Sequence, residues 1–192
     1  MCDLVWSNLQ EFLASFGSLR KGAYNRALMR TAVKLEPEDA AIEVFDLEWI
    51  PPFNQDLESS PPQIVKEFKA KIRKAGALLI ASPEYNYSVP GLLKNAIDRA
   101  SRPYGDNAFE GKPIAIMSAS VGSLGGARAQ YHLRQSFISL EMYPLNRPEV
   151  MMPFAEDNVD ADGNMTNEQT KRLIRELLEA LVRWTRKLKQ KG

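Results

Sequence analysis

The stretch from residue 77 to residue 100 constrains the fold of this chain more than any other part of the sequence. It opens with a continuous apolar run, Ala77–Ala81, which is typical of a parallel strand buried on both faces. It continues past Pro90 and Gly91 into apolar residues at helical spacing, and a proline at the first helical position costs little. A buried strand, a loop and a helix in this order predict an α/β sheet. In such sheets ligands bind beyond the carboxyl ends of the strands, so the loop at residues 83–88 is the first candidate for a site.

The side chains of this loop suit a flat ring with polar edges. Tyr85 and Tyr87 supply rigid stacking surface at low entropic cost. Asn86, Ser88 and the main-chain N–H groups can form hydrogen bonds with the heteroatoms of such a ring. The loop holds no histidine, no cysteine and no nucleophile beside a base. An ordinary surface turn is the alternative, and the strand before the loop and the helix after it favour the binding site.

The segment before residue 17 fits two kinds of element. Apolar residues repeat at helical spacing from Leu9 to Phe16, whereas the alternation that begins at Phe12 suits a strand. The next residues, 17–25, form a loop rich in turn residues and hydrogen-bond donors, and they lead into a helical run at residues 26–33. A loop of this kind before a helix favours the strand.

The loop at residues 17–25 is also a candidate anion site. A loop that leads into a helix N-terminus presents unpaired main-chain N–H groups and the positive end of the helix dipole. Ser18, Arg20 and Asn25 would add side-chain donors, and an arginine can bind a phosphate through two parallel N–H bonds. The loop contains neither a Walker A pattern nor Gly-x-Gly-x-x-Gly, so we expect a monophosphate held without metal. A solvated basic turn is the alternative.

A third polar loop follows the short apolar run Ile114–Met117. Residues 118–126 are rich in serine and glycine, and a Gly-rich backbone at the end of a strand lets a ligand approach closely. The helical run at residues 127–140 comes next and carries His132, the only histidine of the sequence. We expect this side chain at the surface or in an interface rather than in catalysis.

Two further segments carry motifs with more than one interpretation. Residues 49–56 form a Pro-rich loop with two aromatic side chains, which suits either a pocket rim or packing under a long connection. Residues 158–163 resemble the start of a calcium-binding loop, but Gln169 stands where that loop needs a bidentate glutamate. We predict an acidic turn there, with Thr166 and Gln169 forming the capping box of the last helix.

Charge and composition narrow the classes of partner. The 192 residues include 25 basic and 24 acidic side chains, a net charge of +1, which provides no long-range attraction for nucleic acid or an anionic membrane. The single cysteine, Cys2, excludes an intrachain disulfide, and one histidine leaves no His/Cys metal cluster. No apolar run approaches the ~20 residues of a membrane span, and no secretory signal is recognisable at residue 1. We expect a cytoplasmic protein with no nucleic-acid or membrane partner.

Strands and helices alternate along the chain, and this order predicts the architecture. We predict one flavodoxin-like domain over residues 1–192, a three-layer α/β sandwich with about five parallel strands. In the strand order 2-1-3-4-5, the first and third strands flank the point where the order reverses. The three polar loops follow the predicted first, third and fourth strands, so we expect them to meet at one edge of the sheet.

Three motifs in these loops are shared with a known family. They are Gly17-Ser18-Leu19-Arg20 with Asn25, Pro83-Glu84-Tyr85-Asn86-x-Ser88-x-Pro90-Gly91 continuing to Asp98, and Gly122-x-x-Gly125-Gly126 continuing to Arg134. The sequence resembles the NAD(P)H-dependent FMN reductase family, and within it the soluble quinone reductases that are also described as chromate reductases. The likeness covers nearly everything from Gly17 onward, and its second motif is highly specific.

The resemblance implies a flavodoxin-like fold that binds FMN noncovalently and uses NAD(P)H as co-substrate. It implies that the phosphate is held by Ser18, Arg20 and Asn25, and the ring by Pro83, Glu84, Tyr85, Asn86 and Tyr87, with Ser120 and Gly122 nearby. It implies a ping-pong mechanism, in which NAD(P)+ leaves before a quinone, chromate or another small oxidant takes two electrons. No catalytic side chain is expected, because the flavin carries the redox chemistry. It further implies a homodimer or homotetramer, since residues 131–134 resemble the tetramer-forming region of the chromate reductases.

The sequence departs from the family pattern at three places. Ala23 stands where a serine is usual, so one phosphate hydroxyl is lost, and Arg99-Ala100 stands where an aromatic residue is common after Asp98. The first strand lacks the usual apolar run before Gly17. Two other classes therefore stay open: a flavodoxin-type electron carrier and a flavin-free interaction protein with the same fold. Carriers of the first kind are usually strongly acidic, and the net charge of +1 disfavours them.

Overall fold

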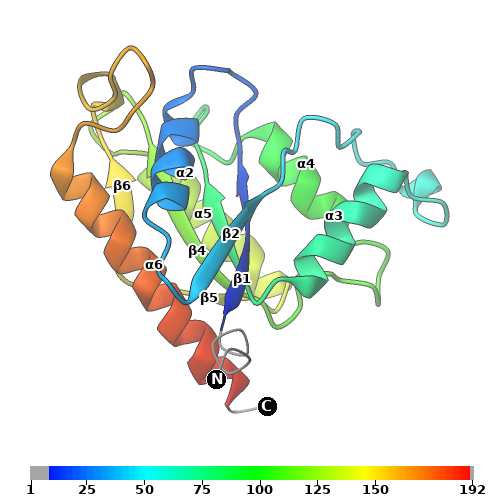
Figure 1. Cartoon of the computed structure of the whole chain (residues 1–192). Coiled ribbons are helices and arrows are strands. Elements are labelled where there is room, and N and C mark those ends of the chain that lie inside the picture. Colours follow the sequence, from blue (N-terminus) through cyan, green and yellow to red (C-terminus); the bar gives the residue numbers. More distant parts are fainter. Residues whose placement is uncertain (1–8, 191–192) are drawn as a thin grey trace.

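The computed structural model describes residues 9–190, in which strands and helices alternate and pack in three layers (Figure 1). The strands are β1 (Gln10–Phe16), β2 (Ala40–Val44), β3 (Ala77–Ala81), β4 (Pro113–Ala119), β5 (Tyr143–Pro144) and β6 (Val150–Met152). The helices are α2 (Tyr24–Lys34), α3 (Gln63–Lys74), α4 (Gly91–Ala100), α5 (Ala127–Ser139) and α6 (Glu168–Lys189), with short 3-10 turns η1 (Gln55–Leu57) and η2 (Ala155–Asp157). Cys2 lies outside the described residues, and the extent of one domain over residues 1–192 stays a prediction.

The strands form one parallel sheet in the order β2-β1-β3-β4-β5, which confirms the predicted flavodoxin-like order. The described sheet has six strands, because the fifth position is divided between β5, which pairs with the start of β4, and β6, which pairs with its end. Pro144 and Pro148 lie in the segment that separates β5 from β6, and a proline has no N–H to donate to a strand ladder.

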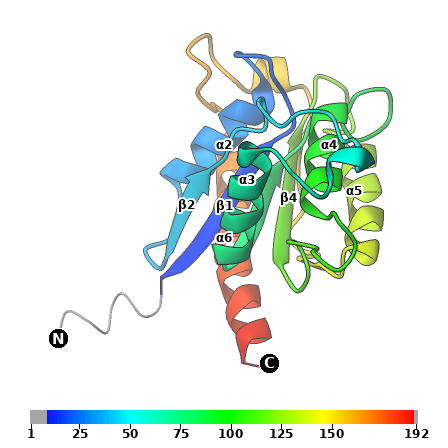
Figure 2. The same cartoon turned by 90° about the vertical axis from the view of Figure 1, so that its right-hand side faces the viewer.

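Residues of the central strands alternate between two apolar cores. Phe12, Ala14 and Phe16 of β1 pack in the core beneath α2 and α6, whereas Leu13 packs in the core beneath α3, α4 and α5. The same alternation continues along β3 and β4, so the sheet is covered on both faces, and Figure 2 looks onto the face that carries α3, α4 and α5. The prediction of a strand before residue 17 is confirmed. The alternation of apolar residues from Phe12 indicated it correctly, whereas the helical spacing from Leu9 did not.

β1 and β3 end level with one another, and β4 continues two residues further, to Ala119. Phe16 pairs with Ala81, and Ala81 in turn pairs with Met117. The ladder continues one residue further, because the N–H of Gly17 donates to the Ala81 carbonyl at 3.0 Å and the N–H of Ser82 donates to the Met117 carbonyl at 3.0 Å. The loops that follow β1 and β3 therefore start at the same height, and the loop that follows β4 starts two residues further along the same edge of the sheet.

The Pro-rich loop predicted at residues 49–56 packs on α4. The Asn95 side chain donates to the main-chain carbonyl of Pro51 at 3.1 Å and accepts from the N–H of Phe53 at 2.7 Å. The buried Arg99 donates from Nε to the Pro51 carbonyl at 3.1 Å. Arg99 thus fastens this loop to the helix.

The capping box predicted for the last helix is wrong. The N-cap of α6 is Asn167, whose side chain accepts from the N–H of Thr170 at 2.8 Å, so Thr166 and Gln169 form no capping box. The N–H of Thr166 instead donates to the Asn158 carbonyl at 3.0 Å and closes the preceding turn. That turn is acidic as expected, and the main-chain N–H of Asn164 lowers the pKa of Asp160.

Within residues 9–190, no helix combines the length and the apolar character needed to cross a membrane.

We predict that Asn167→Ala lowers the free energy of unfolding by about 1 kcal/mol, because α6 loses the acceptor at its N-cap. Thr166→Ala is the matched control, since it removes the hydroxyl that a capping box at residue 166 would use. Urea unfolding followed by circular dichroism measures both. A larger loss for Thr166→Ala than for Asn167→Ala would contradict the assignment of the cap.

Candidate functional site

A cavity of about 360 Å³ lies at the edge where the three loops meet. It is lined by Ser18, Arg20, Ala23, Tyr24, Asn25, Pro83, Glu84, Tyr85, Ala119, Ser120 and Val121. The structure thus gathers predicted residues from all three loops around one hollow. Asn86, Tyr87 and Gly122 lie outside its lining, although each belongs to one of the same loops. Tyr24, Ala119 and Val121 line the cavity but were not among the predicted site residues.

The first loop leads directly into the N-terminus of α2. Ala23 is the N-cap residue, and no side chain caps this helix end. The first N–H groups of a helix have no partner inside the helix, so this end can accept an anion. Ser18 is buried and its hydroxyl lies 3.2 Å from the Tyr85 hydroxyl. The exposed Arg20 donates from Nη2 to the Gly22 carbonyl at 2.6 Å, which keeps its side chain beside the loop.

Asn25 joins α2 to the end of β4. Its amide nitrogen donates to the Ala119 carbonyl at 2.9 Å, and its amide oxygen accepts from the Ala119 N–H at 3.0 Å. The side chain is buried, and one N–H of its amide is left for a further acceptor. Asn25 therefore sets the distance between the first and third loops.

The second loop ends in a tight turn. The N–H of Tyr85 donates to the Ser88 carbonyl at 3.1 Å, and the N–H of Ser88 donates back to Tyr85 at 3.0 Å. Asn86 and Tyr87 between them both have positive φ, 49° and 67°, as two-residue turns of this kind require. Both rings of this loop are exposed, Tyr85 by 51% and Tyr87 by 66%, so they remain available for stacking.

Glu84 contacts α5 through its carboxylate. Oε2 accepts from the main-chain N–H groups of Arg128 at 2.9 Å and Ala129 at 3.2 Å, and Oε1 accepts from Nη1 of Arg128 at 2.9 Å. His132 is exposed, as expected, and its Nδ1 lies 3.1 Å from the Ser88 hydroxyl. Sequence reasoning missed these contacts, because nothing in the local pattern relates residue 84 to residue 128.

The glycines of the third loop approach the protein's own backbone. A Cβ on Gly125 would lie 2.7 Å from the carbonyl carbon of Met151, and one on Gly126 would lie 2.8 Å from the Cβ of Ser118. Both residues have positive φ, 59° and 88°. We expected Gly-rich backbone here to admit a ligand. At these two positions, however, the close approach is to β6 and β4.

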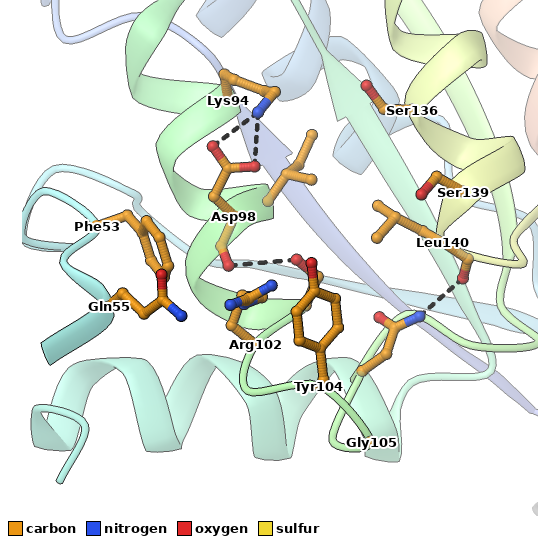
Figure 3. Close-up of a pocket in the computed structure, with 13 residues that line it drawn as sticks. Phe53, Gln55, Lys94, Asp98, Arg102, Tyr104, Gly105, Ser136, Ser139 and Leu140 are labelled. Carbon is orange, nitrogen blue, oxygen red and sulfur yellow. Dashed lines mark hydrogen bonds and ion pairs between the residues drawn. The ribbon is translucent and has the colours of Figure 1, made fainter. Parts of the chain in front are cut away.

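A larger cavity, about 590 Å³, lies between the C-terminal parts of α4 and α5 (Figure 3). Its charged groups are already paired, because Lys94 binds Asp98 at 2.6 Å and Nε of Arg102 binds Glu58 at 2.7 Å. Asn107 donates to the Leu140 carbonyl at 2.9 Å. α4 and α5 run opposite to the parallel strands, so this cavity lies away from the edge where the three loops meet. We therefore place the candidate site in the smaller cavity.

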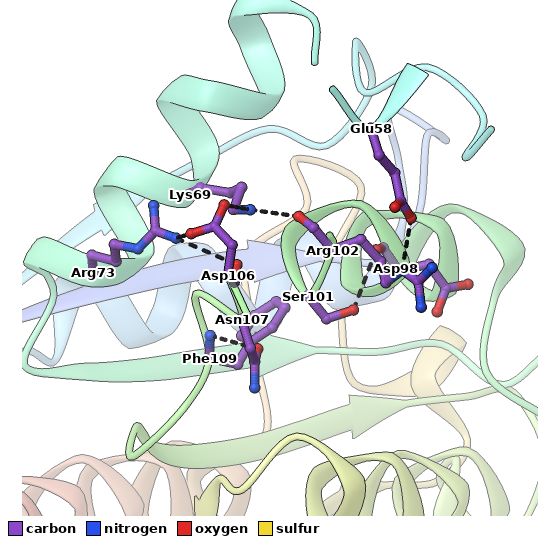
Figure 4. A network of polar contacts seen from close by, with 9 residues as sticks. All are labelled: Glu58, Lys69, Arg73, Asp98, Ser101, Arg102, Asp106, Asn107 and Phe109. Atoms are coloured by element: carbon purple, nitrogen blue, oxygen red, sulfur yellow. Dashed lines mark hydrogen bonds and ion pairs between the residues drawn. The ribbon is translucent and has the colours of Figure 1, made fainter. Parts of the chain in front are cut away.

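Arg102 and Asn107 of the larger cavity's lining also belong to a polar network beside it (Figure 4). Lys69 of α3, whose side chain is buried, donates to the Arg102 carbonyl and to the Asp106 carboxylate, which also binds Arg73. The hydrogen bond from Lys69 lowers the pKa of Asp106, and the positive charges of Lys69 and Arg73 lower it further against the opposing effect of burial. This network holds the loop after α4 against α3 and has a structural role.

The parallel sheet in the order β2-β1-β3-β4-β5, with a polar cavity at its carboxyl edge, defines a flavodoxin-like protein. A family model described as NADPH-dependent FMN reductase matches residues 11–157. The chain belongs to the NADPH-dependent FMN reductase family.

Individual relatives match over most of their length. An NAD(P)H-dependent FMN reductase of Pseudomonas aeruginosa is 48% identical over 174 residues, which cover 90% of this chain and 94% of that protein. An NAD(P)H:quinone oxidoreductase of Solanum tuberosum is 43% identical over 182 residues, 91% of this chain and 92% of that protein. The solved structure of FerB, a flavoenzyme NAD(P)H:(acceptor) oxidoreductase from Paracoccus denitrificans, superposes with a TM-score of 0.85 at 34% identity, covering 93% of this chain and 98% of that one.

The network around Asp106 predicts a pH-dependent contribution to stability. The pKa of Asp106 is lower in the folded protein than its ordinary value of 3.8, so the contribution is complete above that value and is lost as the pH falls below it. We expect Asp106→Asn to lower the free energy of unfolding at pH 7 by about 1 kcal/mol, a value discounted because the carboxylate is half exposed.

Urea titrations of both proteins at pH 7 and at pH 3 measure this effect. The difference between wild type and variant should narrow at pH 3. A difference that stays constant or widens on acidification would contradict the role of the ionised carboxylate.

Proposed function

We propose that the chain binds FMN in the cavity at the carboxyl edge of the sheet and transfers two electrons from NAD(P)H to quinones. The family and its relatives place the activity among NAD(P)H-dependent FMN and quinone reductases, with FMN as cofactor. The observation that supports FMN binding in this cavity is the convergence of three loops on it, with the N-terminus of α2 and the aromatic turn at residues 85–88 beside it.

The residues of the first loop suit the phosphate of FMN. Ser18 offers a hydroxyl, Arg20 offers guanidinium N–H groups, and Asn25 offers one remaining amide N–H. The N-terminus of α2 adds main-chain donors and the positive end of its dipole. Since Ala23 provides no hydroxyl, we assign more of the phosphate affinity to Arg20.

The second and third loops suit the ring of the flavin. Pro83, Tyr85 and Ser120 line the cavity and supply apolar surface, stacking area and a hydroxyl. We propose that Asn86, Tyr87 and Gly122, which lie just outside the lining in the same loops, complete the ring site when FMN is bound. Glu84 belongs to this set through its main chain, because its carboxylate is engaged by α5.

FMN supplies the hydride and electron chemistry when it is bound. The chain's own residues bind and orient it, and among the described residues no acid–base pair of side chains lines the cavity. We propose that NAD(P)H and the oxidant use the same open face in turn, a ping-pong order in which NAD(P)+ leaves first. Quinones are the proposed oxidants, and chromate and other small oxidants are further candidates.

We further propose that the protein assembles as a homodimer or homotetramer. The outer face of α5 exposes Tyr131 by 49% and Ile138 by 79%, and these apolar side chains support a homodimer or homotetramer. The phenol of Tyr131 donates to Glu149 at 3.2 Å, which orders the neighbouring segment. Cytoplasmic location stays a prediction from the sequence.

We predict that Arg20→Ala weakens FMN binding by about 1–3 kcal/mol, because a charged hydrogen-bond donor to the phosphate is lost. Lys21→Ala is the matched control, since Lys21 is exposed in the same loop and does not line the cavity. Titration of flavin-free protein with FMN, followed by flavin fluorescence, gives the dissociation constants. Equal constants for Arg20→Ala and wild type would refute the phosphate assignment.

We further predict that the purified protein is yellow and that anaerobic NADPH or NADH bleaches its flavin absorbance promptly. Addition of a quinone should then restore the colour. A yellow protein that neither nucleotide bleaches would be an electron carrier instead. A colourless protein that takes up no added FMN would be a flavin-free interaction protein.

A further inference from the structure

Glu84 provides the cap of α5 from outside that helix. The residue at the N-cap of α5 is Gly126, which has no side chain to offer, and the first turn of α5 contains no acidic residue. The Glu84 carboxylate accepts from two main-chain N–H groups of that turn, those of Arg128 and Ala129, at 2.9 and 3.2 Å. It therefore supplies both the acceptor and the negative charge that a helix N-terminus favours.

Two more contacts join the same loop to the same helix. The Arg128 guanidinium lies 3.9 Å from the centre of the Tyr87 ring and also binds Glu84 Oε1 at 2.9 Å. One turn further along α5, His132 contacts the Ser88 hydroxyl at 3.1 Å. The turn at residues 85–88 is thus flanked on both sides by attachments to the first two turns of α5.

The turn needs this support because of its backbone. Asn86 and Tyr87 both adopt positive φ, which costs free energy for residues with a Cβ and persists where surrounding contacts hold it. Glu84 directly precedes the turn, and its side chain is only 11% exposed. Its oxygens are already used by three donors, so it has little left to offer a ligand.

We propose that Glu84 is a positioning residue, which ties the ring-binding turn to the N-terminus of α5 and so sets the ring half of the flavin site. This inference rests on the proposed function. It separates two halves of the site: Arg20 acts on the phosphate, whereas Glu84 acts on the ring. Riboflavin, which has the ring of FMN but no phosphate, distinguishes the two.

The experiment compares FMN and riboflavin binding to wild type, Glu84→Ala, Glu84→Gln and Arg20→Ala. Glu110→Ala is the matched control, because Glu110 is exposed just before β4, at the opposite edge of the sheet. Glu84→Ala should weaken both flavins by the same factor, about tenfold or more. Arg20→Ala should weaken FMN alone, and Glu84→Gln should fall between wild type and Glu84→Ala, because its amide oxygen still accepts one N–H.

Two readouts do not depend on activity. The visible circular dichroism of bound FMN should change in the Glu84 variants and not in Arg20→Ala, because only the former alter the surroundings of the ring. In flavin-free protein, hydrogen exchange at the N–H groups of Arg128 and Ala129 should be faster in Glu84→Ala than in wild type or Glu110→Ala.

The outcomes distinguish this inference from the proposed function. A folded Glu84→Ala that binds both flavins as tightly as wild type, or that loses affinity for FMN alone, would overturn the positioning role. If Glu84→Ala does not fold, the affinities of Glu84→Gln for FMN and riboflavin, compared with those of wild type, test the positioning role instead. A wild-type chain that binds neither flavin would overturn the proposed function itself, and exchange at Arg128 and Ala129 would still report whether Glu84 caps α5.

Discussion

The candidate site depends on the fixed register of three parallel strands. Main-chain hydrogen bonds align Phe16 of β1 with Ala81 of β3, and Ala81 with Met117 of β4. Both faces of these strands are buried against helices, so a shift of register by one residue would exchange the two apolar cores. Three loops that are far apart in the sequence therefore begin at one edge of the sheet. No single loop could form the cavity alone.

Contacts among the loops then shape the cavity. Asn25 binds both main-chain groups of Ala119, Ser18 contacts Tyr85, and Glu84 binds the N-terminus of α5. These contacts hold the loops together and use part of the polar groups. The groups left toward the cavity are main-chain N–H groups, aromatic rings, the Ser18 hydroxyl, one amide N–H of Asn25 and the arginine of the first loop. Such a lining suits the binding of a cofactor that performs the chemistry itself, which agrees with the FMN reductase family to which the chain belongs.

The size of a cavity does not identify the site in this fold. The cavity between α4 and α5 is larger, about 590 Å³ against about 360 Å³, but Lys94, Asp98 and Arg102 in its wall are paired within the protein. The network of Lys69 and Asp106 beneath it holds a loop to α3. The smaller cavity is the better candidate, because it lies at the carboxyl ends of the strands and beside the uncapped N-terminus of α2.

Local patterns in the sequence were sufficient for the order of elements, the parallel sheet and the three candidate loops. A strand or helix buries its residues at a fixed spacing, and this spacing is visible in the sequence. Examples are the alternation from Phe12, the apolar run at Ala77–Ala81 and the residues after Pro90. Contacts between residues that are distant in the sequence produce no such regular spacing. The tertiary structure alone decided that the Glu84 carboxylate binds α5, that Asn25 binds Ala119, and that Asn167 rather than Thr166 caps α6, because each depends on where the fold places a partner's backbone.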